Sequence, residues 1–210
     1  NFTTATNAYN TAVGAGAGQA VTTGTLNTLI GGLAGDALTV GGSNVSLGYF
    51  SLTADTNGSK SVAVGTAALG DQNFTTATDA FNVAVGQEAG RSVTTGIQNT
   101  FVGGLAGDGT DDYNTAVGSQ AGAAVTTGVE NTFIGGLAGD AVTTGGSNVA
   151  VGRASFTTNT KGNKNVAVGD AALAAFNVTT DTNTYNTAVG QAAGTAVTTG
   201  IQNTLIGAQA

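Results

Sequence analysis

The sequence predicts an all-β fold, a parallel β-roll (β-solenoid) of about twelve coils with 15–21 residues each. Two observations lead to this prediction. A five-residue motif, NTAVG, begins at Asn10, Asn114 and Asn186, and near copies such as NVAVG stand between them. The motif places β-branched residues at a period of two, which is the period of a strand. A short motif that recurs at a nearly constant interval indicates stacked coils, each of which covers the apolar face of the last.

The glycine that closes each motif sets the coil length. Successive motif glycines are 17 residues apart in eight intervals, 21 apart in two and 15 apart in one. Each of the first six glycines has a counterpart 104 residues later, so Gly14 matches Gly118 and Gly103 matches Gly207. We therefore expect a single repeat domain over residues 1–210, with a duplicated six-coil unit at about 10–113 and 114–210. We also expect the sequence to be a fragment of a longer chain.

Asparagine opens nearly every copy of the motif. Glycine supplies positive φ angles at no steric cost, and an Asn side chain can hydrogen-bond to nearby backbone. Because stacked coils bring each motif above the last at about 4.8 Å, we expect the Asn side chains to form a ladder. The predicted ladder consists of Asn10, Asn27, Asn44, Asn82, Asn99, Asn114, Asn131, Asn148, Asn165, Asn186 and Asn203.

The middle residue of the motif is expected to face away from the coil interior. If the two β-branched positions point inward, the residue between them must point to the opposite face. Eleven of the twelve middle residues are apolar, and a strand that is apolar on both faces is usually buried on both. We therefore expect the second face to contact another chain, and the alternative is an exposed flat side of a monomeric solenoid. The subunit-interface candidates are Leu29, Phe101, Phe133 and Leu205.

Composition and charge disfavour several classes of function. The net charge is −7 and the charged residues are scattered singly, which argues against nucleic acid and anionic membranes as partners. No apolar run approaches the roughly 18 residues that cross a bilayer, so we expect no membrane insertion in this segment. The chain contains neither His nor Cys, which excludes Ser-His and Cys-His triads and zinc sites made of Cys and His.

Carboxylates are the remaining candidates for catalysis. A glycan-cleaving tail spike needs two of them at a suitable separation. At a spacing of 104 residues only Asp36 and Asp140 match acid to acid, whereas Asp55 matches Asn159. Most acidic residues are therefore interpreted as surface residues that vary between the two copies. We expect no enzymatic activity, no catalytic residue, no metal site and no cofactor, with a depolymerase kept as an alternative.

Several copies of the motif resemble a known family. The stretches SVAVGTAA at Ser61–Ala68, NVAVGRAS at Asn148–Ser155 and NVSLGYFS at Asn44–Ser51 resemble the head repeat of YadA-like trimeric autotransporter adhesins, which has the form SVAIGxxS. Repeats with a TTG turn and an NTxIG strand, as at Thr126–Gly135, are similar to those of phage tail-fibre proteins and of surface proteins that end in a chaperone-of-endosialidase-type domain.

The resemblance implies a homotrimer of left-handed parallel β-rolls. It also implies an extracellular location, on a bacterial cell surface or on a phage tail fibre, and a role in binding a cell-surface glycan or a protein receptor. The motif is more specific for the architecture than for the function. The coils here are longer than is usual in that family, so the ligands of particular adhesins are not carried over.

Exposed contact candidates are few. Tyr49 and Phe50 are adjacent after Gly48, where an aromatic pair can stack on a sugar or anchor a receptor. The alternative is that both rings cover a local gap or a neighbouring subunit. Lys60 and Lys164 hold equivalent positions beside the motif and read as solvated charges or as protection of a sheet edge.

Three alternative functions follow from other features. A stack of coils can continue end to end as a self-assembling extracellular filament. The TTG turns suggest the flat threonine array of an ice-binding solenoid, although they do not occur in every coil. A glycan-depolymerising tail spike is the third alternative. The TTG turns begin at Thr22, Thr94, Thr126 and Thr198, and more loosely at Thr143.

Overall fold

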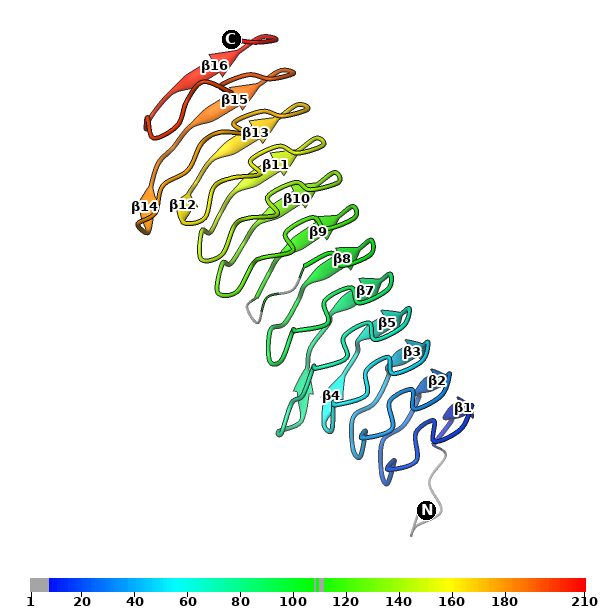
Figure 1. Cartoon of the computed structure of the whole chain (residues 1–210). Coiled ribbons are helices and arrows are strands. Elements are labelled where there is room, and N and C mark those ends of the chain that lie inside the picture. Colours follow the sequence, from blue (N-terminus) through cyan, green and yellow to red (C-terminus); the bar gives the residue numbers. More distant parts are fainter. Residues whose placement is uncertain (1–7, 108, 110–111) are drawn as a thin grey trace. The chain divides into compact units, whose positions relative to one another are not determined.

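The structure is a computed structural model that describes residues 8–107, 109 and 112–210. Over these residues the chain is all-β without a helix, and parallel strands stack as a β-solenoid. Figure 1 shows the strands following one another from coil to coil. The predicted fold class, a parallel β-solenoid, is confirmed. Contacts divide the chain into two units, Asn1–Gly104 and Leu105–Ala210, and each unit is described by itself.

The first unit contains one parallel sheet in chain order. Each strand pairs with the next in the same register, so Thr11 is aligned with Thr28 and Val62 with Val83. The six strands are β1 (Thr11–Val13), β2 (Thr28–Ile30), β3 (Val45–Leu47), β5 (Val62–Val64), β7 (Val83–Val85) and β8 (Thr100–Val102). Two shorter strands, β4 (Gly58–Ser59) and β6 (Thr78–Asp79), form a separate parallel pair.

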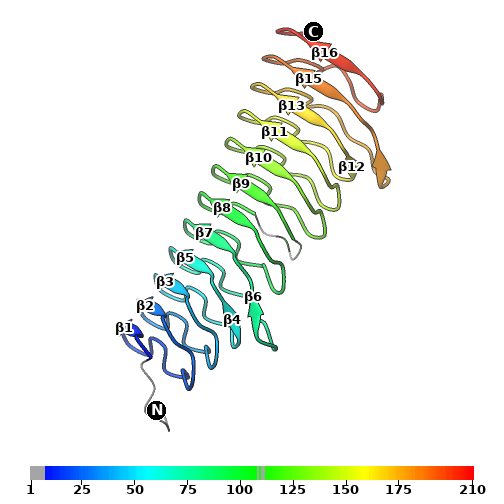
Figure 2. The same cartoon turned by 180° about the vertical axis from the view of Figure 1, so that it is seen from behind.

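The second unit repeats this arrangement. Its register is again coil on coil, with Thr132 aligned with Val149 and Val166 with Thr187. The strands are β9 (Thr115–Val117), β10 (Thr132–Ile134), β11 (Val149–Val151), β13 (Val166–Val168), β15 (Thr187–Val189) and β16 (Thr204–Ile206). The short pair is β12 (Gly162–Asn163) and β14 (Thr182–Asn183). Figure 2 shows both units from behind.

Each motif strand points its middle residue into the coil, which is the reverse of the prediction. Leu29 and Phe133 are 1% exposed, whereas the adjacent Ile30 and Ile134 are each 40% exposed. The prediction that the β-branched residues point inward is therefore wrong. The four interface candidates are wrong as well, because their side chains lie inside their own coil, where Leu205 is half-buried and the other three are buried. They are Leu29, Phe101, Phe133 and Leu205.

The reason is the narrow coil interior. Opposite each strand lies the small residue three positions after the motif glycine, such as Ala34 or Ala138, and both are fully buried. Ser46, the one polar middle residue, shows the contact directly, because its hydroxyl lies 2.6 Å from that of Ser51. The space admits one inward side chain from each strand, so the first and third residues of the strand point outward.

Interior volume is shared between the middle residue and the residue four positions after the motif glycine. The coil of β10 has Phe133 in the middle and Gly139 at the later position, where an added Cβ would lie 2.5 Å from Cε1 of Phe133. The next coil reverses the sizes, with Ala150 in the middle and a fully buried Phe156. In these coils a large side chain thus enters from one side or the other. Where both positions are small, a ring of the next coil fills the space, as Phe101 does beside Gly90 and Phe133 beside Gly122, which keeps the interior close-packed. Further pairs are Leu29 with Gly35, Ala63 with Leu69, and Ala167 with Leu173.

The motif asparagines connect successive coils. Asn44 donates its backbone N–H to Oδ1 of Asn27 at 3.0 Å, while Nδ2 of Asn27 donates to the carbonyl of Gly41 at 2.9 Å. One side chain thus satisfies a donor and an acceptor in buried backbone. The backbone N–H groups that donate to the preceding motif Asn belong to Asn27, Asn44, Ser61, Asn99, Asn131, Asn148, Asn165, Asn186 and Asn203. Their acceptors are Asn10, Asn27, Asn44, Asn82, Asn114, Asn131, Asn148, Asn165 and Asn186.

The closing glycine is required by backbone proximity. At Gly48 the φ angle is +149°, and an added Cβ would lie 2.3 Å from the carbonyl oxygen of Gly65 in the next coil. No other residue type fits such an approach without moving the backbone. The recurrence of the motif thus follows from its role as the contact between coils.

Ser61 stands where the ladder needs an asparagine, and a buried polar network occupies the gap. Gln72 donates from Nε2 to Oδ2 of Asp55 at 2.7 Å and to the Ser61 hydroxyl at 3.2 Å. Its Oε1 accepts from Nδ2 of Asn82 at 2.8 Å. In the second unit the ladder is continuous through Asn165, and the counterpart of Gln72 is an apolar residue, Phe176.

Candidate functional site

In the part of the chain that the structure describes, no helix is long and apolar enough to cross a membrane. The described residues also contain no group of three or more His, Cys, Asp or Glu side chains placed to hold a metal ion.

Asp55 is a buried acid with a structural setting. Burial raises the pKa of its carboxyl group, and hydrogen bonds from Gln72 and from backbone N–H groups oppose part of that rise. Its carboxylate accepts from the N–H of Gly58 at 2.9 Å and of Phe74 at 3.1 Å. The side chain has no exposed surface, so it is not placed to meet a substrate.

The outward residues of the motif strands form a repeating, mainly apolar surface on each unit. These are the first and third residues of each strand, and we call them the outer sheet face of that unit. All are Thr, Val, Ile or Leu, and none carries a charge. Ile30 and Ile134 are 40% exposed, and Val85 and Val189 are 37% exposed. β-Branched residues in this position are typical of a pleated surface that packs against another.

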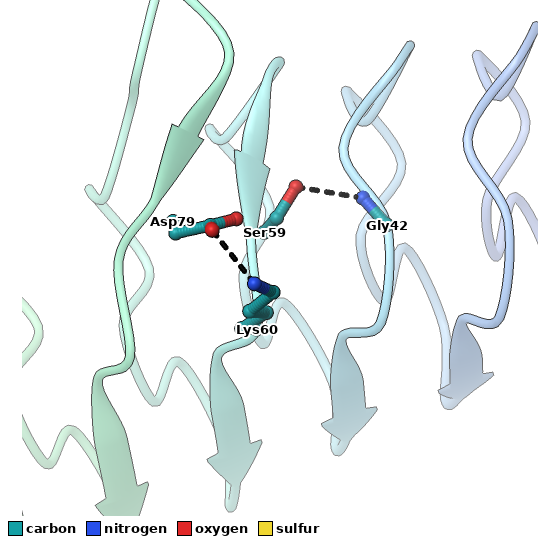
Figure 3. Close-up of polar contacts among 4 residues, drawn as sticks. All are labelled: Gly42, Ser59, Lys60 and Asp79. Carbon is teal, nitrogen blue, oxygen red and sulfur yellow. Dashed lines mark hydrogen bonds and ion pairs between the residues drawn. The ribbon is translucent and has the colours of Figure 1, made fainter.

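A second exposed column lies just before the motif asparagines. Lys60 forms an ion pair with Asp79 at 2.7 Å, and its Nζ lies 5.0 Å from the centroid of the Phe81 ring. Figure 3 shows Lys60 directed to Asp79 from beside β4, where the Ser59 hydroxyl accepts from the Gly42 N–H at 3.0 Å. The ammonium charge is thus already neutralised, as expected for a solvated charge at a sheet edge.

The same column in the second unit keeps the cation–π contact. Nζ of Lys164 lies 5.5 Å from the Tyr185 ring centroid, and the counterpart of Asp79 is Asn183. A contact of this kind at an exposed site contributes about 0.5–1 kcal/mol. The contact holds the two side chains of this column together and supplies no acid or base for catalysis.

Tyr49 and Phe50, the predicted contact residues, lie at the surface of the first unit. Tyr49 is 54% exposed, while Phe50 is half-buried. Their ring centroids are 4.2 Å apart at an interplanar angle of 74°, an edge-to-face contact. Phe50 borders a hollow of about 270 Å³. The residues that line the hollow are Phe50, Thr53, Ala67, Gly70, Asp71 and Arg91.

Sequence reasoning identified Phe50 but missed its polar neighbours in this hollow. Asp71 and Arg91 lie on later coils, and coil stacking brings them to Phe50. The backbone N–H of Asp71 donates to the carbonyl of Arg91 at 2.9 Å. Arg91 also forms an ion pair with Glu88 at 3.2 Å. The sequence contained a signal for these residues. Asp71, Glu88 and Arg91 are charged, whereas the residues 104 positions later are uncharged.

Comparisons with known proteins identify no relative. No family model matches the chain, no curated protein matches it significantly, and no solved structure does so. The function is therefore inferred from the surfaces of the chain itself.

Proposed function

We propose that this chain is a structural segment of an extracellular adhesive fibre that associates with copies of itself, as a homotrimer. It would form part of the head or shaft of a bacterial surface adhesin or a phage tail fibre, and it would present contacts to a cell-surface glycan or protein receptor. The single observation that carries the proposal is the outer sheet face, which is uncharged, rich in Val, Ile and Leu, and half-buried to exposed in each unit. Contiguous exposed apolar surface often marks a contact surface.

A second copy of the chain is the partner that fits this face best. The outer residues repeat at every coil, at a strand spacing of about 4.8 Å, and a second copy has the same repeat. Two such faces match coil by coil, whereas an unrelated surface lacks the period. The face carries none of the net charge of −7, so association brings no like charges together. Closed symmetric assemblies are the rule for homo-oligomers, and the resemblance to trimeric adhesin repeats implies three copies.

The proposed mechanism is mechanical and multivalent. A stack of hydrogen-bonded coils is stiff, so it holds contact surfaces at a distance from the cell or virion. Three copies in one fibre present each contact three times, and linked binding events raise the overall avidity without new contacts.

The ice-binding alternative is not favoured by the turns. The Thr22 hydroxyl donates to the Thr39 carbonyl at 3.1 Å, and the Thr126 hydroxyl donates to the Thr143 carbonyl at 3.2 Å. These hydroxyls join one coil to the next. The filament and depolymerase alternatives have no specific observation in their favour.

A charge placed on the outer sheet face tests the proposal. Ile134→Lys adds an ammonium group to that face of the second unit, and we expect the native mass from light scattering after gel filtration to fall towards that of one chain. Ser147→Lys is the matched control, because Ser147 is exposed and lies in the column of the second unit that already contains Lys164. We expect the control to keep its assembled mass. An Ile134→Lys chain that folds and keeps the wild-type mass contradicts the proposal.

A further inference from the structure

We propose that the hollow beside Phe50 is a binding site for an uncharged pyranose sugar. This deepens the proposed function, since it supplies the contact of an adhesive fibre, but the site lies within the first unit and can be tested without regard to assembly. The hollow of about 270 Å³ is slightly smaller than pockets for drug-sized ligands, which are roughly 300–1,000 Å³. One sugar ring, or the end of a short glycan, is a ligand of suitable size.

Phe50 supplies the apolar wall of the site. Its backbone has a φ of 57°, and its N–H donates to the Gly32 carbonyl at 3.1 Å. The Tyr49 ring packs edge-to-face on it at 4.2 Å. The half-buried Phe50 ring is thus held in place by its neighbour. A preordered aromatic face suits the C–H groups of a sugar, because it loses little conformational freedom on binding.

Asp71 and Arg91 supply complementary hydrogen-bonding groups. A carboxylate accepts from sugar hydroxyls and a guanidinium donates to them. The Thr53 hydroxyl already donates to Oδ1 of Asp36 at 2.5 Å, which leaves the two charged groups as the main polar contacts. Both stand at the border of the same hollow as the Phe50 ring.

The charge balance of the hollow favours a neutral ligand over an anionic one. Arg91 is paired with Glu88 at 3.2 Å, and Asp71 adds a second negative charge nearby. The positive charge of Arg91 is thus already balanced, so a carboxylate or phosphate ligand would meet excess negative charge. A polyhydroxyl ligand incurs no such repulsion.

The internal duplication supplies a natural control. The second unit repeats the coils, yet the three residues that give the hollow its chemistry are all replaced, by Ala154, Ala175 and Thr195. Of the other three lining residues, Thr53 and Ala67 match Thr157 and Ala171, whereas Gly70 is replaced by Ala174. The aromatic ring, the acid and the base are separated by up to 41 positions in the sequence, between Phe50 and Arg91. Because all three are present in the first unit and absent from the second, the second unit is an internal control for the site.

The test uses the whole chain and a panel of methyl pyranosides of glucose, galactose, mannose and N-acetylglucosamine. Saturation-transfer NMR detects contact between the protein and each sugar. The variant F50A/D71A/R91T gives the first unit the residues of the second, so its fold is already supported by the chain itself. We expect at least one pyranoside to bind the wild type, and the triple variant to bind it about tenfold more weakly or not at all.

Three controls make the result decisive. The reciprocal variant A154F/A175D/T195R should give the second unit a measurable contact with the same sugar. Circular dichroism and native mass should be unchanged in the triple variant, which separates failure of this site from failure of the self-association proposal. The inference is overturned if no pyranoside binds, if binding survives in the triple variant, or if only sialic acid or inorganic phosphate binds.

Discussion

Replacing Phe133 by alanine should destabilise the second unit by about 3–5 kcal/mol, the usual cost of deleting a buried phenylalanine ring. The side chain is 1% exposed. Its neighbours in the interior include Gly122 and Gly139, where an added Cβ would lie 2.8 Å and 2.5 Å from ring atoms. Since glycine has no side chain to move into the space, the cavity cannot collapse well. We therefore expect a value in the upper half of that range.

Urea unfolding followed by circular dichroism, at one fixed protein concentration, measures this cost. Phe133→Leu is the matched control, because leucine occupies the same interior position at Leu29 and Leu205, and it should cost on the order of 1 kcal/mol. The variant F133A/G139F copies the neighbouring pair Ala150 and Phe156 and should recover part of the loss. A cost below about 1 kcal/mol for Phe133→Ala would refute the inward orientation of the middle residue.

Three further predictions concern the contacts between coils. Because burial raises the pKa of Asp55 above 3.8, the folded protein holds that proton more tightly than the unfolded chain, so stability should fall as pH rises from about 3.8 through the raised pKa. Asp55→Asn, which copies Asn159, should lack this decline. If the urea midpoints of the variant and the wild type changed with pH in the same way, the prediction for Asp55 would be wrong. Gly48→Ala should lower the stability measured by thermal unfolding by about 3 kcal/mol or more. Gly104→Ala should cost much less, because its Cβ would meet only the Gln87 carbonyl oxygen at 3.9 Å. Equal costs for the two variants would argue against the close approach at Gly48. Asn131→Ala removes an acceptor for the Asn148 N–H at 3.0 Å and a donor to the Gly145 carbonyl at 2.9 Å. It should therefore lower the stability by about 2–4 kcal/mol and speed amide hydrogen exchange at Asn148. Unchanged exchange at Asn148 would contradict the ladder.

The period of the motif was sufficient to predict the coils and their parallel stacking. Each residue of a solenoid lies above its equivalent in the last coil, so sequence spacing becomes position in space. This is why Asn27 and Asn44 could be expected to meet. Orientation was not predictable from the same pattern, because Val and Ile alternate with Ala, Leu and Phe, and both faces of the strand are apolar.

Volume decides the orientation, and the sequence contains that signal in a less obvious form. A large middle residue such as Phe133 is accompanied by Gly139, and a small one such as Ala150 by Phe156. Such an exchange of size is expected only between side chains that share one interior. The hollow beside Phe50 is similar, because the residues that complete it lie on other coils. Only the comparison of the two internal copies marks them as a set.

Self-association through the outer sheet face is tested most directly by sedimentation equilibrium of the whole chain at two concentrations. We predict a stable species near three times 20.1 kDa, because burial of the Val, Ile and Thr side chains of that face requires further copies. A single species of 20.1 kDa at both concentrations would contradict the proposal and would leave this apolar face exposed to water.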